Sequence, residues 1–197
     1  MKLLDSKREI TDNRLIEYIE KERGISREVY SPLLNQFEVL VKNHNKPARK
    51  AIYCGMVNYK GNGAFISNWF KKTGSRYLFL KCFLDEKHPI ILNYFTRKCI
   101  LFSSIWDLMS YLNLNIEVQD KIKQKVCLIV VIGGTKKDFK DLQLEKFAKV
   151  GSCFRRNETG DRYTRNFLKV FPKGIDLRDK ELIGNAKSLN DVVKGVI

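Results

Sequence analysis

Two adjacent arginines, Arg155 and Arg156, follow a short apolar segment and precede a helical pattern that starts near Thr159. This is the pattern of a strand that leads into a helix, and ligands of open α/β sheets bind at that edge. A guanidinium group holds a phosphate through paired hydrogen bonds without a bridging metal, and backbone N–H groups at the helix start favour an anion. The pair therefore predicts a phosphate-binding position, with surface ion pairs to Asp161 or Glu158 as the alternative.

A second set of cations lies in residues 39–84, a stretch that contains no Asp or Glu. Aromatic residues are interleaved with these cations. Cations neutralise phosphates and aromatic faces stack on unpaired bases, although Tyr53 and Phe79 fit better as core residues of strands. Together the two regions predict a nucleic-acid contact surface made of Lys46, Arg49, Lys50, Lys60, Lys71, Lys72, Arg76, Arg155, Arg156, Arg162 and Arg165.

The composition of the 197-residue chain also favours a polyanionic partner. Lys and Arg number 37 against 22 Asp and Glu, so the formal net charge is +15. That excess excludes the acidic surface of a typical cytosolic enzyme and favours nucleic acid over an anionic membrane. No run approaches the roughly 18 apolar residues of a membrane helix, and residues 1–12 lack the apolar core of a signal peptide. We therefore expect a cytoplasmic protein without membrane association.

The sequence contains few residues from which other kinds of site could be built. The two histidines, His44 and His88, cannot supply a zinc site or a catalytic triad. The five cysteines are scattered without a C-x-x-C pair and fit reduced core residues. The pair Gly133-Gly134 fits a turn at the end of a strand better than a phosphate loop, because no Gly-Lys-Ser/Thr or G-x-G-x-x-G pattern accompanies it. We expect no cofactor.

Hydrophobic periodicity predicts the elements that position these residues. Helices are expected over 13–22, 26–37, 105–112, 137–148, 159–170 and 189–196, and strands over 38–42, 51–57, 64–67, 77–84, 99–102, 126–132, 150–154 and 174–177. The alternation of strands and helices in the second half predicts an α/β domain with a mainly parallel central sheet flanked by helices. We therefore expect an α/β chain with an α+β N-terminal subdomain, 1–96, and an α/β subdomain, 97–197.

Four segments of the second half resemble one known family in order and spacing. They are Phe-Ser-Ser-Ile-Trp-Asp-Leu-Met-Ser (102–110), Val-Val-Ile-Gly-Gly-Thr (130–135), Phe-Arg-Arg-Asn-Glu-Thr-Gly (154–160) and Lys-Ser-Leu-Asn-Asp (187–191). They are similar to the Toprim domain, the metal-binding α/β module of bacterial primases, topoisomerases and some nucleases. The subtype they resemble is the primase-like group of Bacteroidetes mobile elements. Arg-Gly-Ile (23–25), Ala-Ile (51–52) and the segment 62–68 resemble the region before Toprim in that group, so the resemblance covers residues 13–195.

The resemblance implies a divalent cation held by one glutamate and two aspartates, and this chain lacks those carboxylates. Ser103 stands at the glutamate position, and Arg155 and Asn157 stand at the aspartate positions, while Asp107 keeps its carboxylate. A cation beside a metal site opposes binding of the ion. The resemblance therefore implies a degenerate metal site made of Ser103, Asp107, Arg155 and Asn157, without bound metal.

Three functions remain open from the sequence. The first is a non-catalytic Toprim-like protein of a mobile element or phage that binds nucleic acid, DNA before RNA. The second is a divergent metal-dependent primase, topoisomerase or nuclease with replacement ligands among Asp107, Glu158, Asp161 and Asp191. The third is an interaction module that occupies the nucleic-acid site of a partner protein.

Overall fold

The computed structural model describes residues 16–34, 37–43, 52–58, 66–73, 76–80, 89–92, 96–131 and 133–195. The chain divides into two compact units, Met1–His88 and Pro89–Ile197. The first strand of the second unit, β5 (Ile90–Leu92), lies before the boundary predicted at residues 96 and 97.

The described part of the first unit contains two short helices followed by an antiparallel sheet. The π-helix η1 (Tyr18–Glu22) and the helix α2 (Arg27–Leu34) flank Gly24, whose φ of 65° suits glycine. Helix α2 contains Pro32 in its interior. The sheet has the order β1-β2-β3-β4, with strands Phe37–Asn43, Ile52–Asn58, Ile66–Thr73 and Arg76–Leu80.

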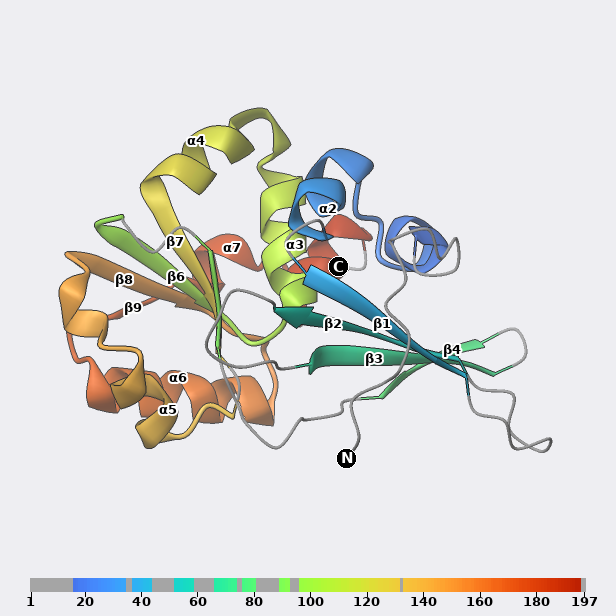
Figure 1. Ribbon diagram of the computed structural model, residues 1–197. Coiled ribbons are helices and arrows are strands. Elements are labelled where there is room, and N and C mark those ends of the chain that lie inside the picture. Colours follow the sequence, from blue (N-terminus) through green and yellow to red (C-terminus); the bar gives the residue numbers. More distant parts are fainter. Residues whose placement is uncertain are drawn as a thin grey trace. The chain divides into compact units, whose positions relative to one another are not determined.

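The second unit is built around a five-stranded sheet in the order β5-β7-β6-β8-β9 (Figure 1). Strands β7 (Val126–Val130), β6 (Lys98–Phe102), β8 (Lys149–Cys153) and β9 (Ile175–Asp176) are parallel, and β5 pairs with β7 in the antiparallel direction. The strands β6, β7 and β8 consist mostly of buried residues, as expected for a parallel sheet that is covered on both faces. The predicted fold class, a mixed α/β chain with a mostly parallel sheet flanked by helices, is confirmed.

Helices cover both faces of this sheet (Figure 1). Helices α5 and α6 pack on one face, where Phe139, Phe154 and Phe167 form part of the core with Cys99 and Leu101 of β6. Helices α3 and α4 pack against β7, and α3 also packs against α8. The helical segments are α3 (Ile105–Leu114), η2 (Ile116–Val118), α4 (Gln119–Lys125), α5 (Lys136–Asp141), η3 (Leu144–Lys146), α6 (Glu158–Val170), α7 (Arg178–Glu181) and α8 (Leu189–Val193).

Two side-chain caps fix where α3 and α6, the helices that follow β6 and β8, begin. Ser104 accepts the backbone N–H of Asp107 at the start of α3, and Asn157 accepts the N–H of Gly160 at the start of α6. Both are residue types that favour the position before a helix. The helix predicted over 137–148 is divided, because α5 ends at Asp141 and Gln143 adopts a left-handed φ of 51° before η3.

Candidate nucleic-acid interface at the sheet edge

The carboxyl ends of β6 and β8 lie side by side, because the two strands are parallel and Phe102 is in register with Cys153. Ser103 and Ser104 follow β6 and lead into α3, whereas residues 154–157 follow β8 and lead into α6. Two segments that are far apart in sequence therefore place their polar side chains at one edge, the edge at which open α/β sheets bind ligands.

Arg155 and Asp107 form an ion pair at this edge. The Nε of Arg155 donates to Oδ2 of Asp107 at 2.9 Å, and its Nη2 donates to the hydroxyl of Ser104 at 3.1 Å. The Asp107 side chain is 2% exposed and the Arg155 side chain is 34% exposed. One side of the guanidinium is therefore fixed by a buried carboxylate, while another part of it reaches solvent.

The hydroxyls of Ser103 and Ser104 surround the same carboxylate. Ser104 donates to Oδ2 of Asp107 at 2.6 Å and Ser103 donates to it at 3.4 Å. The other oxygen, Oδ1, is buried without a donor among the described residues. The pKa of the neighbouring Cys153 thiol is raised well above its usual range, mainly by burial and also by the negative charge of Asp107.

The side chains at this edge do not fit a magnesium site. Mg²⁺ needs several oxygen ligands in near-octahedral geometry. Oδ2 of Asp107 already accepts three hydrogen bonds, and the amide oxygen of Asn157 accepts the N–H of Gly160 at 2.8 Å. The guanidinium of Arg155 adds a repelling charge. No three His, Cys, Asp or Glu side chains in the described part of the chain are grouped so that they could hold a metal ion.

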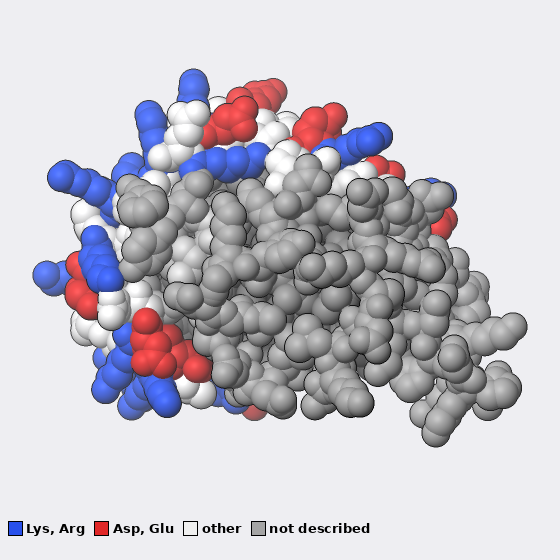
Figure 2. All heavy atoms as spheres, in the orientation of Figure 1, with Lys and Arg blue, Asp and Glu red and all other residues white. Residues whose placement is uncertain are grey.

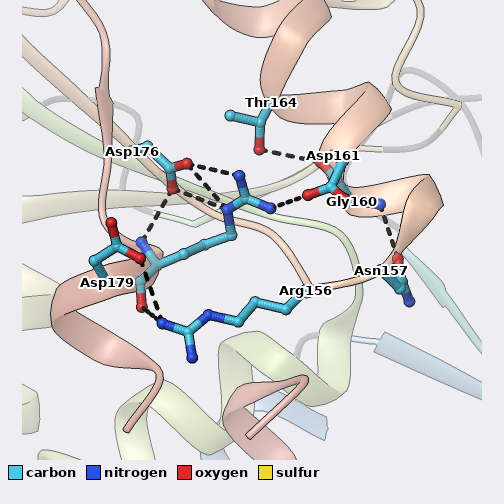
Figure 3. Close-up of polar contacts among 8 residues, drawn as sticks. Arg156, Asn157, Gly160, Asp161, Thr164, Asp176 and Asp179 are labelled. Atoms are coloured by element: carbon cyan, nitrogen blue, oxygen red, sulfur yellow. Dashed lines mark hydrogen bonds and ion pairs between the residues drawn. The ribbon is translucent and has the colours of Figure 1, made fainter. Parts of the chain in front are cut away.

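Arg156 points to the segment that follows β9 instead of to the Asp107 pair (Figure 3). Its Nη1 donates to the carbonyl of Gly184 at 2.7 Å, and its Nη2 lies 3.4 Å from the carboxylate of Asp179. The backbone N–H of Arg156 donates to the carbonyl of Lys187 at 2.7 Å. Arg156 therefore fastens the residues before α8 to the end of β8.

Arg178 joins β9 to the first turn of α6 (Figure 3). Its Nη2 donates to Asp176 at 2.8 Å and its Nη1 donates to Asp161. The hydrogen bonds that Arg178 donates to Asp176 and, to a smaller extent, to Asp161 raise the pKa of Arg178 above its usual value, although burial opposes this shift. Asp161 therefore pairs with Arg178, and the predicted alternative pairing of Arg155 or Arg156 with Asp161 or Glu158 is not what the structure shows.

Arg162 and Arg165 are exposed on α6. Residues three apart lie on the same side of a helix, so these two arginines belong to one face together with the exposed Lys169. The guanidinium of Arg162 lies 5.8 Å from the ring centroid of Tyr163. Helix α6 therefore presents three exposed cations on one face.

The remaining predicted contact residues belong to the first unit. Lys71 and Lys72 lie on β3, in register with Leu78 and Tyr77 of β4, and Arg76 begins β4. The other predicted residues of this stretch lie outside the described residues; they are Lys46, Arg49, Lys50 and Lys60.

Sequence reasoning missed Ser104, Asp176 and Arg178 as members of the polar network. Ser104 stands three residues before Asp107 and directly precedes an apolar helix, which is a capping signal that could have been found. Asp176 is the last residue of β9 and Arg178 is the first residue of α7; both elements are too short for a sequence pattern to stand out.

Comparison with solved structures shows a primase-like fold, although no protein-family model and no curated protein matches the sequence. The primase fragment of the bacteriophage T7 primase–helicase protein matches with a TM-score of 0.50 and 13% identity, over 88% of this chain and 68% of that chain. A structure of the bacteriophage T7 lagging-strand DNA polymerase interacting with primase domains, bound to an RNA/DNA hybrid and dTTP, matches with a TM-score of 0.53 and 13% identity, over 89% and 84%. The similarity to a primase-type fold inferred from sequence is thus confirmed.

Among the described residues, no helix combines the length and the apolar character needed to cross a membrane.

Proposed function

We propose that this protein binds nucleic acid through phosphate contacts and is a non-catalytic, Toprim-like protein of a mobile element or phage. The observation that carries the proposal is the Arg155–Asp107 ion pair at the carboxyl edge of the sheet, at positions where the family resemblance implies a cation held by carboxylates. A guanidinium at this place attracts phosphate directly. The primase-like fold and the formal net charge of +15 support the same conclusion.

Arg155 is the cation best placed to contact a phosphate at this edge. Its Nε and Nη2 are used by Asp107 and Ser104, whereas its Nη1 makes no hydrogen bond with a described residue. Because Asp107 fixes the guanidinium, little side-chain entropy is lost when the outer N–H groups meet a phosphate. Asp107 also neutralises part of the charge of Arg155. We therefore expect Arg155 to position the nucleic-acid backbone, and Arg162 and Arg165 to supply the electrostatic attraction to its phosphates.

The enzyme alternative has less support from the geometry. Of its four candidate ligands, Asp107 is paired with Arg155 and Asp161 is paired with Arg178. Glu158 is exposed at the start of α6, and Asp191 lies in the first turn of α8. A metal site that used Asp107 and Asp161 together would therefore require both ion pairs to break.

Binding of a labelled oligonucleotide at several salt concentrations tests the proposal. Single-stranded DNA, duplex DNA and RNA of the same sequence are compared by fluorescence anisotropy. With about six phosphate contacts, the affinity should fall by about three decades between 50 and 200 mM salt. Binding should tolerate sequence changes, because no recognition-helix or zinc-finger pattern is present. Failure to bind any of the three nucleic acids at 50 mM salt would reject the proposed function.

A further inference from the structure

The opposite edge of the same sheet, where its parallel strands begin, carries a row of cations. Lys98 begins β6 and is in register with Lys149, the first residue of the neighbouring strand β8. Lys125 directly precedes Val126, the register partner of Lys98 on β7. Gly151 of β8 is in register with Ile175 of β9. Lys149 stands two residues before Gly151, and Lys173 stands two residues before Ile175. Four neighbouring parallel strands therefore each have a lysine at their first residue or one or two residues before it.

Arg97 extends this row, because its carbonyl accepts the backbone N–H groups of Ala148 at 2.8 Å and Lys149 at 3.3 Å. We call the five residues Arg97, Lys98, Lys125, Lys149 and Lys173 the amino-edge row. All five are exposed. In the space-filling view, Lys and Arg atoms predominate along the left-hand rim, where the strands of this sheet begin in Figure 1 (Figure 2).

The charges of the amino-edge row are not compensated within the described part of the chain, where none of the five side chains takes part in an ion pair. The acidic residues nearest to the row in sequence are Asp176, which is paired with Arg178 at 2.8 Å, the exposed Glu145, and Asp120, which is paired with Lys123 at 3.8 Å. Like charges on paired positions of neighbouring strands destabilise a sheet. By contrast, Arg155, Arg156 and Arg178 at the carboxyl edge each have a carboxylate partner.

We propose that the amino-edge row is a second nucleic-acid contact surface, which binds the phosphate backbone of one strand. This inference rests on the proposed function. Neighbouring strands are about 4.8 Å apart, so the row extends for about 15 Å across the sheet. Because the row has one lysine for each of four β-strands, it offers contacts to about four phosphates of a single nucleic-acid strand. A row that is one side chain wide fits a linear chain of charges better than the broad plane of a membrane.

Four charge reversals test the row against a control with the same net charge. The row variant is K98E/K125E/K149E/K173E, and the control variant is K136E/K137E/K140E/K194E, whose four lysines are all exposed elsewhere on the second unit. In the row variant, the register partners 98 and 149 again carry like charges, so a change in cross-strand repulsion does not confuse the comparison. A four-residue Lys→Gln version of the row replaces the reversal if the reversal does not fold, as judged by circular dichroism.

The measurement is the anisotropy of a labelled 30-nucleotide oligo-dT between 50 and 200 mM salt. We expect the row variant to bind at least about tenfold more weakly at 50 mM salt, and its plot of log K against log salt to be shallower by about three units, at about 0.7 per lost contact. The control should stay within about threefold of the unmodified protein.

Each other outcome counts against the row. Equal weakening in the row and control variants would mean that only net charge matters, and unchanged binding in the row variant would mean that no phosphate meets the row. Both overturn this inference and leave the proposed function in place. Binding of the unmodified protein to phosphatidylserine vesicles that is lost in the row variant, with oligo-dT binding unchanged, would assign the row to a membrane instead. Absence of oligo-dT binding by the unmodified protein would reject the proposed function itself.

Discussion

At the scale of single residues, the two members of the Arg155–Asp107 ion pair differ in how deeply they are buried. Asp107 is almost fully buried, so it depends on Arg155, Ser103 and Ser104 for its hydrogen bonds. Arg155 is about one-third exposed and can exchange its partner for water. The cost of removing a partner from a buried pair comes mainly from the charge that is left behind in the protein. Loss of the arginine should therefore be worse than loss of the carboxylate charge.

Arg155→Ala should lower the free energy of unfolding by about 3 kcal/mol, because it leaves a buried carboxylate with two weak hydroxyl donors. Asp107→Asn should cost about 1 to 2 kcal/mol, because the remaining arginine is hydrated and the amide oxygen still accepts. Urea unfolding of both variants measures the difference, with Arg165→Ala on the exposed face of α6 as a control that should change stability by less than about 0.5 kcal/mol. If Asp107→Asn proved the more damaging change, the ion pair would not be organised around the buried carboxylate.

At the scale of elements, the edge depends on how closely α6 approaches the end of β8. A Cβ atom placed on Gly160 would lie 1.8 Å from the carbonyl oxygen of Arg155. The first turn of α6 therefore rests directly on the backbone that carries Arg155, and only glycine leaves room for this contact. Gly160 is also the glycine of the segment 154–160 that resembles the Toprim family, so the resemblance marked a residue whose role is packing.

Gly160→Ala should destabilise the protein by about 2 kcal/mol, because the clash is with backbone that cannot rotate away. The higher helix propensity of alanine, worth about 1 kcal/mol, offsets only part of this cost. Thermal and urea unfolding would measure the change, and the neighbouring exposed substitution Thr159→Ala is the matched control. A Gly160→Ala protein as stable as Thr159→Ala would show that α6 does not press on Arg155 as the structure indicates.

The elements also show what a sequence can and cannot predict. Strands β6 and β8 and helices α3 and α6 were predicted to within about two residues, because each has a strong apolar pattern. The three-residue strand β5 and the polar helix α4 were missed, since neither has a period long or apolar enough to detect. The resemblance indicated Ser103, Asp107 and Arg155 as one site. Their pairing was not predicted, because local acids such as Glu158 were considered and a partner 48 residues away was not.

At the scale of the whole molecule, the described charges are distributed unevenly. The arginines at the carboxyl edge of the second sheet are paired with Asp107, Asp179, Asp176 and Asp161. Uncompensated cations lie instead on the outer face of α6 and in the amino-edge row. Within the described part of the second unit, the uncompensated positive charge is therefore spread over an exposed surface and is not concentrated in one buried site. Binding through such a surface depends on counterion release, which is sensitive to salt and needs no metal.

The most direct test of a metal-independent interaction is to measure oligonucleotide binding at fixed ionic strength, first with EDTA and then with Mg²⁺. We predict full binding in EDTA and weaker binding with Mg²⁺, because the divalent cation competes with Lys and Arg for the phosphates. The same direction should be seen in the Asp107→Asn variant, since no metal ligand has been removed. Binding that requires Mg²⁺ and is lost in Asp107→Asn would contradict the account and restore a metal site at the carboxyl edge of the sheet.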